Sequence, residues 1–123
     1  MAKPDAFLSA CPSREVLARL GEKWTSLVIA RLGDGPLRFT DLKNGIDGVS
    51  QKMLTQTLRN LQRDGLIDRE VDATRIPVRV VYALTQTGCS ALPVIRQAKA
   101  WSEANFRRVL TSRKRFDRAT GNP

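Results

Sequence analysis

The side chains best suited to chemical recognition lie in one short segment, residues 50–63. Amide and basic side chains recur there at helical spacing, and they are Lys52, Gln56, Arg59 and Arg63. On a helical wheel they fall opposite an apolar stripe formed by Leu54, Leu58 and Leu61. Glutamine can pair bidentately with adenine in the major groove of DNA, and lysine or arginine with guanine. The segment therefore has the side chains of a DNA-reading helix, although a solvated charged face is the ordinary alternative.

The start of this segment adds a further set of polar groups. Ser50 suits the N-cap, because its hydroxyl can accept a bond from a first-turn backbone N–H. Gln51 and Thr55 lie near the same end, where free backbone N–H groups can hold a phosphate. We interpret all three as candidate DNA contacts.

A second basic group falls in a predicted β-hairpin. Residues 66–71 and 78–84 are rich in β-branched and apolar side chains, and a polar tip separates them. The hairpin carries three arginines, Arg69, Arg75 and Arg79. We interpret them as phosphate or minor-groove contacts, with Arg75 at the tip the best candidate for the minor groove. The alternative is that they are charges protecting an edge strand.

The composition favours a nucleic-acid partner and argues against an enzyme. Lysine and arginine number 21 against 12 acidic residues, which gives a net charge of +9. The chain has no histidine, which excludes histidine-dependent triads and histidine-ligated metals. Its two cysteines, Cys11 and Cys89, cannot make a four-cysteine zinc site. We therefore expect no enzymatic activity, no cofactor and no metal.

Length and hydropathy predict one cytoplasmic domain. A chain of 123 residues suits a single domain. No stretch approaches the roughly 20 apolar residues of a membrane span. Residues 1–10 lack the blocks of a signal peptide and are expected to form a loose arm.

The apolar spacing predicts the elements that position these groups. We expect helices from Pro12 to Gly21, from 22 to 32, from Phe39 to about Gly45 and from Ser50 to Arg63, with a short strand at 37–39. Thr85 can cap a last long helix, and Pro93 should kink that helix or delay its start. This order predicts an α+β, mainly α, winged helix-turn-helix domain over residues 11–111. Residues 112–123 are expected to be a frayed basic tail.

Six sequence blocks resemble those of a known family. They are Cys11-Pro12, Gly21-Glu22-Lys23-Trp24, Gly35-Pro36-Leu37-Arg38-Phe39, Ile46-Asp47-Gly48-Val49-Ser50-Gln51-Lys52-Met53-Leu54, Asp64-Gly65-Leu66-Ile67 and Leu84-Thr85-Gln86-Thr87-Gly88. In order and content they resemble the HxlR-type regulators, bacterial winged-helix proteins related to the MarR group. The resemblance runs from Cys11 to Trp101, and the block ending at Leu54 is its most specific part.

The resemblance implies a homodimer that binds double-stranded DNA at a short inverted repeat and regulates neighbouring genes. It implies that the first and last helices form the dimer, and it supports a wing at Val71 to Val80. The apolar faces of the last helix agree with this, because one small domain could not cover them all. Candidate interface residues are Leu17, Trp101 and Phe106, with plain core packing as the alternative for the two aromatics. We expect a repressor with a pseudo-palindromic operator and half-sites about 34 Å apart.

Cys11 is the candidate redox-sensing residue. A thiol at the start of the first helix feels the helix dipole, and Arg14 could help to lower its pKa. The resemblance implies a sensor of a small electrophile or oxidant. A structural role for Cys11 remains the alternative, and an N-cap at Ser13 would leave the thiol outside the helix. Cys89 is expected to pack rather than react.

Three other functions are alternatives to this one. A winged-helix regulator that responds to a small ligand without a thiol switch would share the fold, as would a winged-helix domain used for protein contacts. An enzyme with Cys11 as its nucleophile would lack a histidine base and any recognisable carboxylate or glycine-rich site.

Overall fold

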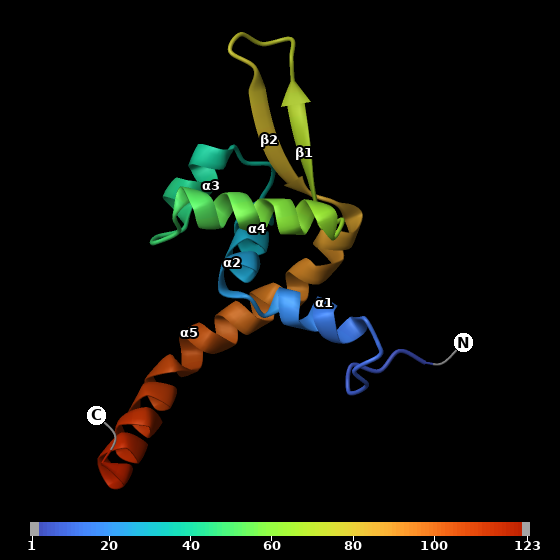
Figure 1. Ribbon diagram of the computed structural model, residues 1–123. Helices are drawn as coiled ribbons and strands as arrows, with labels where there is room; N and C mark the ends of the chain where they lie inside the picture. Colours follow the sequence, from blue (N-terminus) through green and yellow to red (C-terminus); the bar gives the residue numbers. More distant parts are fainter. Residues whose placement is uncertain (1–2, 122–123) are drawn as a thin grey trace.

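Five helices and one two-stranded antiparallel sheet build residues 3–121, the part of the chain described by this computed structural model. In chain order the elements are α1 (Ser13–Leu20), α2 (Lys23–Leu32), α3 (Phe39–Gly45), α4 (Gln51–Arg63), β1 (Ile67–Asp72), β2 (Arg79–Leu84) and α5 (Gln86–Thr120). The hairpin stands at one end of the molecule, and α5 runs towards the opposite end (Figure 1). The predicted winged helix-turn-helix is confirmed.

The hydrophobic core is centred on α2, which packs against both α4 and α5. Its side chains Val28, Ile29 and Leu32 are buried. The inner face of α4 joins the same cluster and includes, as predicted, Leu54, Leu58 and Leu61. Burying one such side chain contributes about 1.5–3 kcal/mol. The core therefore holds α4 in one orientation and fixes which of its faces meets solvent.

The segment before α3 differs from the prediction. The expected strand at 37–39 is reduced to a single bridge, in which Leu37 exchanges backbone hydrogen bonds of 3.0 and 2.8 Å with Tyr82. Arg38 is already the N-cap of α3, and its backbone N–H donates to the Asp41 carboxylate at 3.1 Å. Because Arg38 caps the helix and Phe39 begins it, only Leu37 of the expected strand is left to pair.

The wing is a regular hairpin with a buried base and an exposed end. Its register runs from Ile67 opposite Leu84 to Asp72 opposite Arg79. Both strands begin one residue later than predicted. The backbone N–H of Thr85 donates to the carbonyl of Leu66 at 3.0 Å, which joins the base of the wing to the start of α5.

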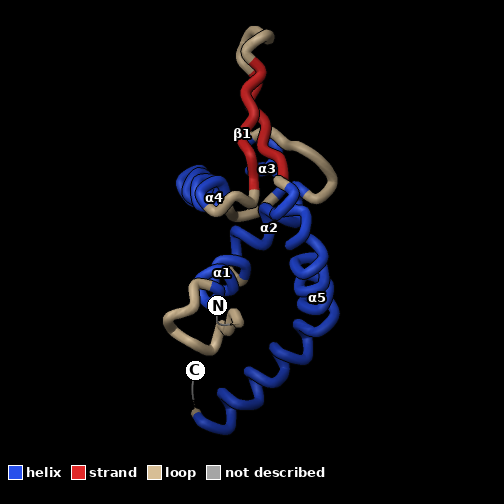
Figure 2. Tube along the Cα trace, turned by 90° about the vertical axis from the view of Figure 1, so that its right-hand side faces the viewer, coloured by secondary structure: helices blue, strands red, loops and turns tan. Residues whose placement is uncertain are grey.

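The last helix is longer than predicted. Thr85 caps α5, as expected, by accepting a 3.1 Å bond from the N–H of Gly88. Pro93 lies inside the helix, so the delayed start expected from it is wrong. The frayed tail is also wrong, because the helix continues to Thr120 and curves along its length (Figure 2). Residues 122 and 123 of that tail lie outside the described residues. Within 3–121, no helix is long and apolar enough to span a membrane.

The N-terminal arm is folded into turns. Arg14 organises it, because the guanidinium donates to the carbonyls of Ala6 and Phe7 at 3.0 and 2.7 Å. Residues 3–10 form no helix or strand, but they are not the loose arm that the sequence predicts. Residues 1 and 2 of that arm lie outside the described part of the chain.

Candidate nucleic-acid interface

Two side-chain hydrogen bonds to the backbone lie in the first half of α4. The hydroxyl of Ser50 accepts a 3.1 Å bond from the backbone N–H of Met53, which confirms Ser50 as the N-cap. Thr57, which sequence analysis did not single out, is buried, and its hydroxyl donates to the carbonyl of Met53 at 2.8 Å. The buried hydroxyl of Thr57 is therefore satisfied within the helix. The face of α4 that points away from the core is left for a partner.

That outer face of α4 is entirely exposed at the residues predicted to contact DNA. They are Ser50, Gln51, Lys52, Thr55, Gln56 and Arg59. One amide hydrogen of Gln56 is bonded to the side-chain oxygen of Asn60 at 3.1 Å. Its second N–H and its carbonyl are left for a base edge. Among residues 3–121, no ion pair involves Lys52 or Arg59, so their charges are available to a polyanion.

The acidic residue that follows α4 is neutralised away from this face. Asp64, the C-cap, accepts a 2.9 Å bond from the guanidinium of Arg19 in α1. Partial burial alone would lower the pKa of Arg19, but the bonds with Asp64 and Glu22 raise it above its usual value. The pair ties α1 to the end of α4 and removes a negative charge from the interface.

Two of the three wing arginines lie together with a basic residue that sequence analysis missed. Arg75 and Arg79 line a cavity of about 300 Å³ with Arg38, which precedes α3. Ile76 lines the same cavity and is 98% exposed. Arg38 is distant in sequence from the wing. The sequence shows it only as a basic residue before a short helix, which does not indicate that it lies beside the wing.

The third wing arginine is on the other face of the hairpin. Arg69 is opposite Tyr82, whereas Arg79 is opposite Asp72. Side chains alternate between the two faces of a strand, and this register places the two pairs on different faces. The structure therefore does not bring Arg69 together with Arg75 and Arg79.

The tip of the wing contains one carboxylate beside its arginine. Asp72 accepts bonds from the hydroxyl and the backbone N–H of Thr74, and these bonds lower the pKa of Asp72. The charged carboxylate lies 3.8 Å from the guanidinium of Arg75. Both side chains are largely exposed, so this pair is weak and Arg75 can exchange it for a phosphate.

Cys11 is half-buried and lies before α1 rather than inside it. Pro12 is the N-cap of α1, one residue earlier than the alternative at Ser13. The Cys11 sulfur lies 3.0 Å from the Ser13 hydroxyl. Hydrogen bonds with the Ser13 side chain and backbone, and then with the backbone of Asp5, lower the pKa of the Cys11 thiol.

The expected helper of this thiol is placed elsewhere. Arg14 was expected to lower the pKa of Cys11, but its guanidinium is bonded to the carbonyls of the N-terminal turns. The groups that lower the pKa are hydroxyl and backbone dipoles instead. That expectation is wrong because adjacency in sequence does not fix where a long side chain points.

The remaining predicted residues are exposed. Cys89 is exposed near the start of α5, so the expectation that it packs is wrong. Leu17, Trp101 and Phe106 are 63%, 62% and 46% exposed, so none belongs to the core. The core alternative for the two aromatics is therefore wrong for this chain.

A helix-turn-helix with an outward amide and basic face, followed by a basic wing, defines a DNA-binding transcriptional regulator. The HxlR-like helix-turn-helix family matches residues 19–110, and the chain belongs to that family.

Three solved relatives have the same fold. The transcriptional regulator YtfH of Salmonella typhimurium superposes with a TM-score of 0.81 and is 37% identical, covering 91% of this chain and 99% of its own. The redox regulator HypR in its oxidised form gives 0.71 at 36% identity, covering 77% and 97%. The quinone-bound YodB of Bacillus subtilis gives 0.62 at 34% identity, covering 76% and 99%. Each of the three likenesses covers at least 76% of this chain.

Proposed function

We propose that the chain is a repressor that binds a pseudo-palindromic operator as a homodimer and responds to an electrophile or oxidant through Cys11. The observation that carries the DNA-reading part is the exposed face of α4, where Lys52, Gln56 and Arg59 face solvent. Neither Lys52 nor Arg59 forms an ion pair within residues 3–121. A recognition helix with these side chains can read base edges in the major groove. Arg75 and Arg79 of the wing would add phosphate or minor-groove contacts.

Homodimerisation is supported by the uncovered half of α5. The buried residues of α5 all lie in its first ten positions, and the last of them is Ile95. Beyond it the helix exposes four large apolar side chains: Trp101, Phe106, Leu110 and Phe116. The part of α5 beyond Ile95 has no core contact and needs a partner to hold it. A second copy offers the same apolar face under two-fold symmetry. Leu17 of α1 would extend this surface.

Repression and the operator follow from the dimer. A dimer seated on promoter DNA excludes RNA polymerase from it, so we propose that the bound form represses. Two recognition helices related by a two-fold axis would read two half-sites about one DNA turn, roughly 34 Å, apart.

Thiol sensing is supported by the surroundings of Cys11 and by the relatives. The lowered pKa raises the thiolate fraction, and the thiolate is the form that attacks electrophiles. Among the relatives, HypR is a redox regulator with a solved oxidised form, and YodB has a solved quinone-bound form. A modification at Cys11 would lie between α1 and the N-terminal turns, next to the proposed dimer surface.

Fluorescence anisotropy on the DNA upstream of the gene tests both parts of this proposal. The reduced protein should bind tightly, and Gln56→Ala or Lys52→Ala should cost about 1–3 kcal/mol and relax the sequence preference. A mild thiol oxidant should release the DNA, dithiothreitol should restore binding, and Cys11→Ser should abolish the response. Equal losses on all DNA sequences would contradict base reading by α4. An oxidant response that persists in Cys11→Ser would contradict sensing by Cys11.

A regulator without a thiol switch is the second candidate, and one observation favours it. A cavity lies between α2 and α5, at the junction of the DNA-reading and dimer-forming parts of the chain. Tight DNA binding that an oxidant leaves unchanged would favour this function.

A further inference from the structure

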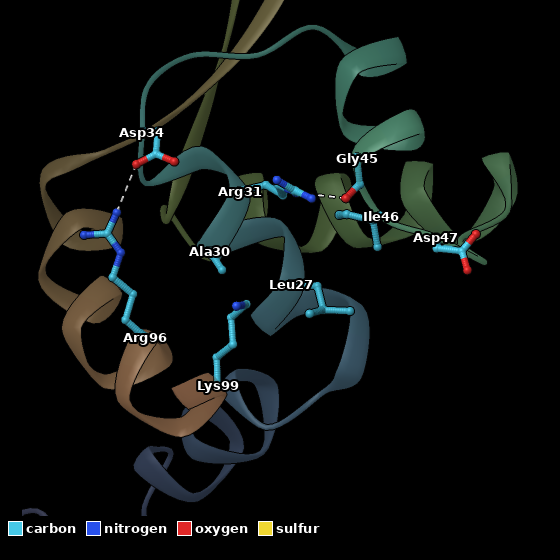
Figure 3. Close-up of a pocket in the computed structure, with 9 residues that line it drawn as sticks. All are labelled: Leu27, Ala30, Arg31, Asp34, Gly45, Ile46, Asp47, Arg96 and Lys99. Atoms are coloured by element: carbon cyan, nitrogen blue, oxygen red, sulfur yellow. Dashed lines mark hydrogen bonds and ion pairs between the residues drawn. The ribbon is translucent and has the colours of Figure 1, made fainter. Parts of the chain in front are cut away.

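That cavity has a volume of about 530 Å³ and lies between α2, the turn that follows α3 and the middle of α5 (Figure 3). Its volume falls within the roughly 300–1,000 Å³ of small-molecule sites. Leu27 and Ala30 of α2 and Ile46 of the turn give it an apolar wall. Arg96 and Lys99, one turn apart on α5, bring two cationic groups to the opposite side.

Both cations on α5 can turn towards a ligand at low cost. Arg96 lies 3.4 Å from the Asp34 carboxylate, and the Asp34 side chain is 93% exposed. Lys99 lies 2.8 Å from Glu103, and these two side chains are at least half exposed. Exposed pairs of this kind contribute little, so an anion in the cavity can replace the acidic partners.

The rest of the lining is consistent with a negatively charged occupant. Arg31 donates from Nε to the carbonyl of Gly45 at 2.8 Å, and this bond orients its guanidinium beside the cavity. The carboxylate of Asp47 points away from the other lining side chains (Figure 3). The lining therefore combines an apolar wall with three positive groups and two carboxylates, of which Asp34 pairs with Arg96 and Asp47 points away.

We propose that this cavity binds a small organic anion with an apolar body and a carboxylate. The apolar body would lie against Leu27, Ala30 and Ile46. The carboxylate would pair with the Arg96 guanidinium, whose planar fork suits two carboxylate oxygens, and with the Lys99 ammonium.

The position of the cavity suggests an effector site, and this step rests on the proposed function. Gly45 ends α3, and Ile46 and Asp47 begin the turn between α3 and α4, the two helices of the helix-turn-helix. Arg96 and Lys99 belong to α5, the helix proposed to form the dimer. A ligand that contacts both favours one position of α4 relative to α5. Occupancy would thus change the spacing of the two recognition helices and the affinity for the operator.

Binding is tested first, without DNA, with 2-naphthoate as the probe. Titration of the full chain followed by calorimetry and backbone NMR should show saturable binding, with shifts at Ala30, Ile46 and Arg96. Arg96→Gln and Lys99→Gln should each weaken it by about tenfold, because each removes a charge-assisted bond. The matched control Arg107→Gln removes an arginine from the same helix outside the cavity and should leave binding unchanged. Neutral 2-naphthamide should not bind.

Three results would overturn the proposal of an anion site. They are no saturable binding, equal binding of the amide, and equal binding by the Arg96 and Lys99 variants. Circular dichroism would confirm that both variants fold, as their exposure predicts.

Operator affinity is measured separately, with and without saturating 2-naphthoate. A change of about fivefold or more that Arg96→Gln abolishes would support the effector role. Binding in the cavity with no change in operator affinity would overturn that role and leave the anion site standing. A chain that binds the probe but no DNA would instead contradict the proposed function.

Discussion

At the level of single residues, the surroundings of Cys11 are set by local dipoles rather than by a cation. The sulfur lies 3.0 Å from the Ser13 hydroxyl, and this bond is the main cause of the lowered pKa. A lowered pKa means that the thiolate fraction rises at a lower pH than for an ordinary cysteine. Cys11 should thus react at a lower pH than an ordinary cysteine, without a neighbouring base.

Ser13→Ala should raise the pKa of Cys11, because it removes the largest of the groups that lower it. Iodoacetamide alkylation followed over pH, in a Cys89→Ser background, should show its midpoint move to higher pH and its rate at pH 7 fall. Ser9→Ala, in the N-terminal turns, is the matched control and should leave the profile in place. An unchanged profile in Ser13→Ala would contradict this account of the thiol.

Arg75 carries a second residue-scale prediction. Because its pair with Asp72 is exposed and 3.8 Å long, the guanidinium is free to contact DNA. Arg75→Ala should weaken binding on all sequences and lower the slope of log affinity against log salt by about one. The salt slope of Arg75→Ala is compared with that of Arg69→Ala, a variant on the other face of the hairpin. Anisotropy titrations at several salt concentrations measure the affinity and the salt slope of each variant. An unchanged slope in Arg75→Ala would exclude a phosphate contact.

At the level of elements, the sequence predicts α2, α3 and α4 to within about one residue. Each has a complete apolar stripe and a stop signal, so its periodicity and its ends agree. The length of α5 escapes prediction, because residues beyond 111 touch no core and composition cannot distinguish a frayed tail from a continued helix. The bridge at Leu37 escapes for a related reason, since its partner Tyr82 is distant in sequence.

The candidate site was predictable where it lies on one helix and not where distant segments meet. The outward face of α4 follows from the position of Leu54, Leu58 and Leu61. The faces of the wing depend on the register across the tip, which the sequence does not reveal, so the separation of Arg69 from Arg79 was missed. The cavity beside Arg96 was missed because α2, a turn and α5 build it together.

Gly88 joins α5 to the wing, and its lack of a side chain is required there. A Cβ at this position would overlap the carbonyl oxygen of Leu66, a backbone atom that cannot move without the hairpin. Gly88→Ala should therefore destabilise the fold by about 3 kcal/mol, as overpacking does. Gly21→Ala is the matched control, because its Cβ would meet no atom closer than 3.7 Å. Urea denaturation measures both, and equal stability of the two variants would contradict the close approach.

At the level of the whole molecule, the DNA-reading and apolar surfaces lie at opposite ends. The wing and α4 lie towards one end, while the C-terminal half of α5 extends towards the other (Figures 1 and 2). A partner copy on α5 would therefore leave both recognition helices uncovered. This separation lets dimerisation and DNA binding be altered independently.

Trp101→Ala tests the dimer through this separation. Trp101 is 62% exposed and lies outside the core, so its removal should leave the folded protomer intact. If α5 forms the interface, the variant should raise the dimer dissociation constant by about tenfold or more, as loss of a buried aromatic anchor does. Sedimentation equilibrium measures this, and Ile76→Ala at the exposed wing is the control that should stay dimeric. A full-strength Trp101→Ala dimer would place the interface elsewhere, while loss of helical signal would give Trp101 a role in folding. A folded monomer that keeps weak binding to a single half-site would show that dimerisation supplies the affinity for the complete operator.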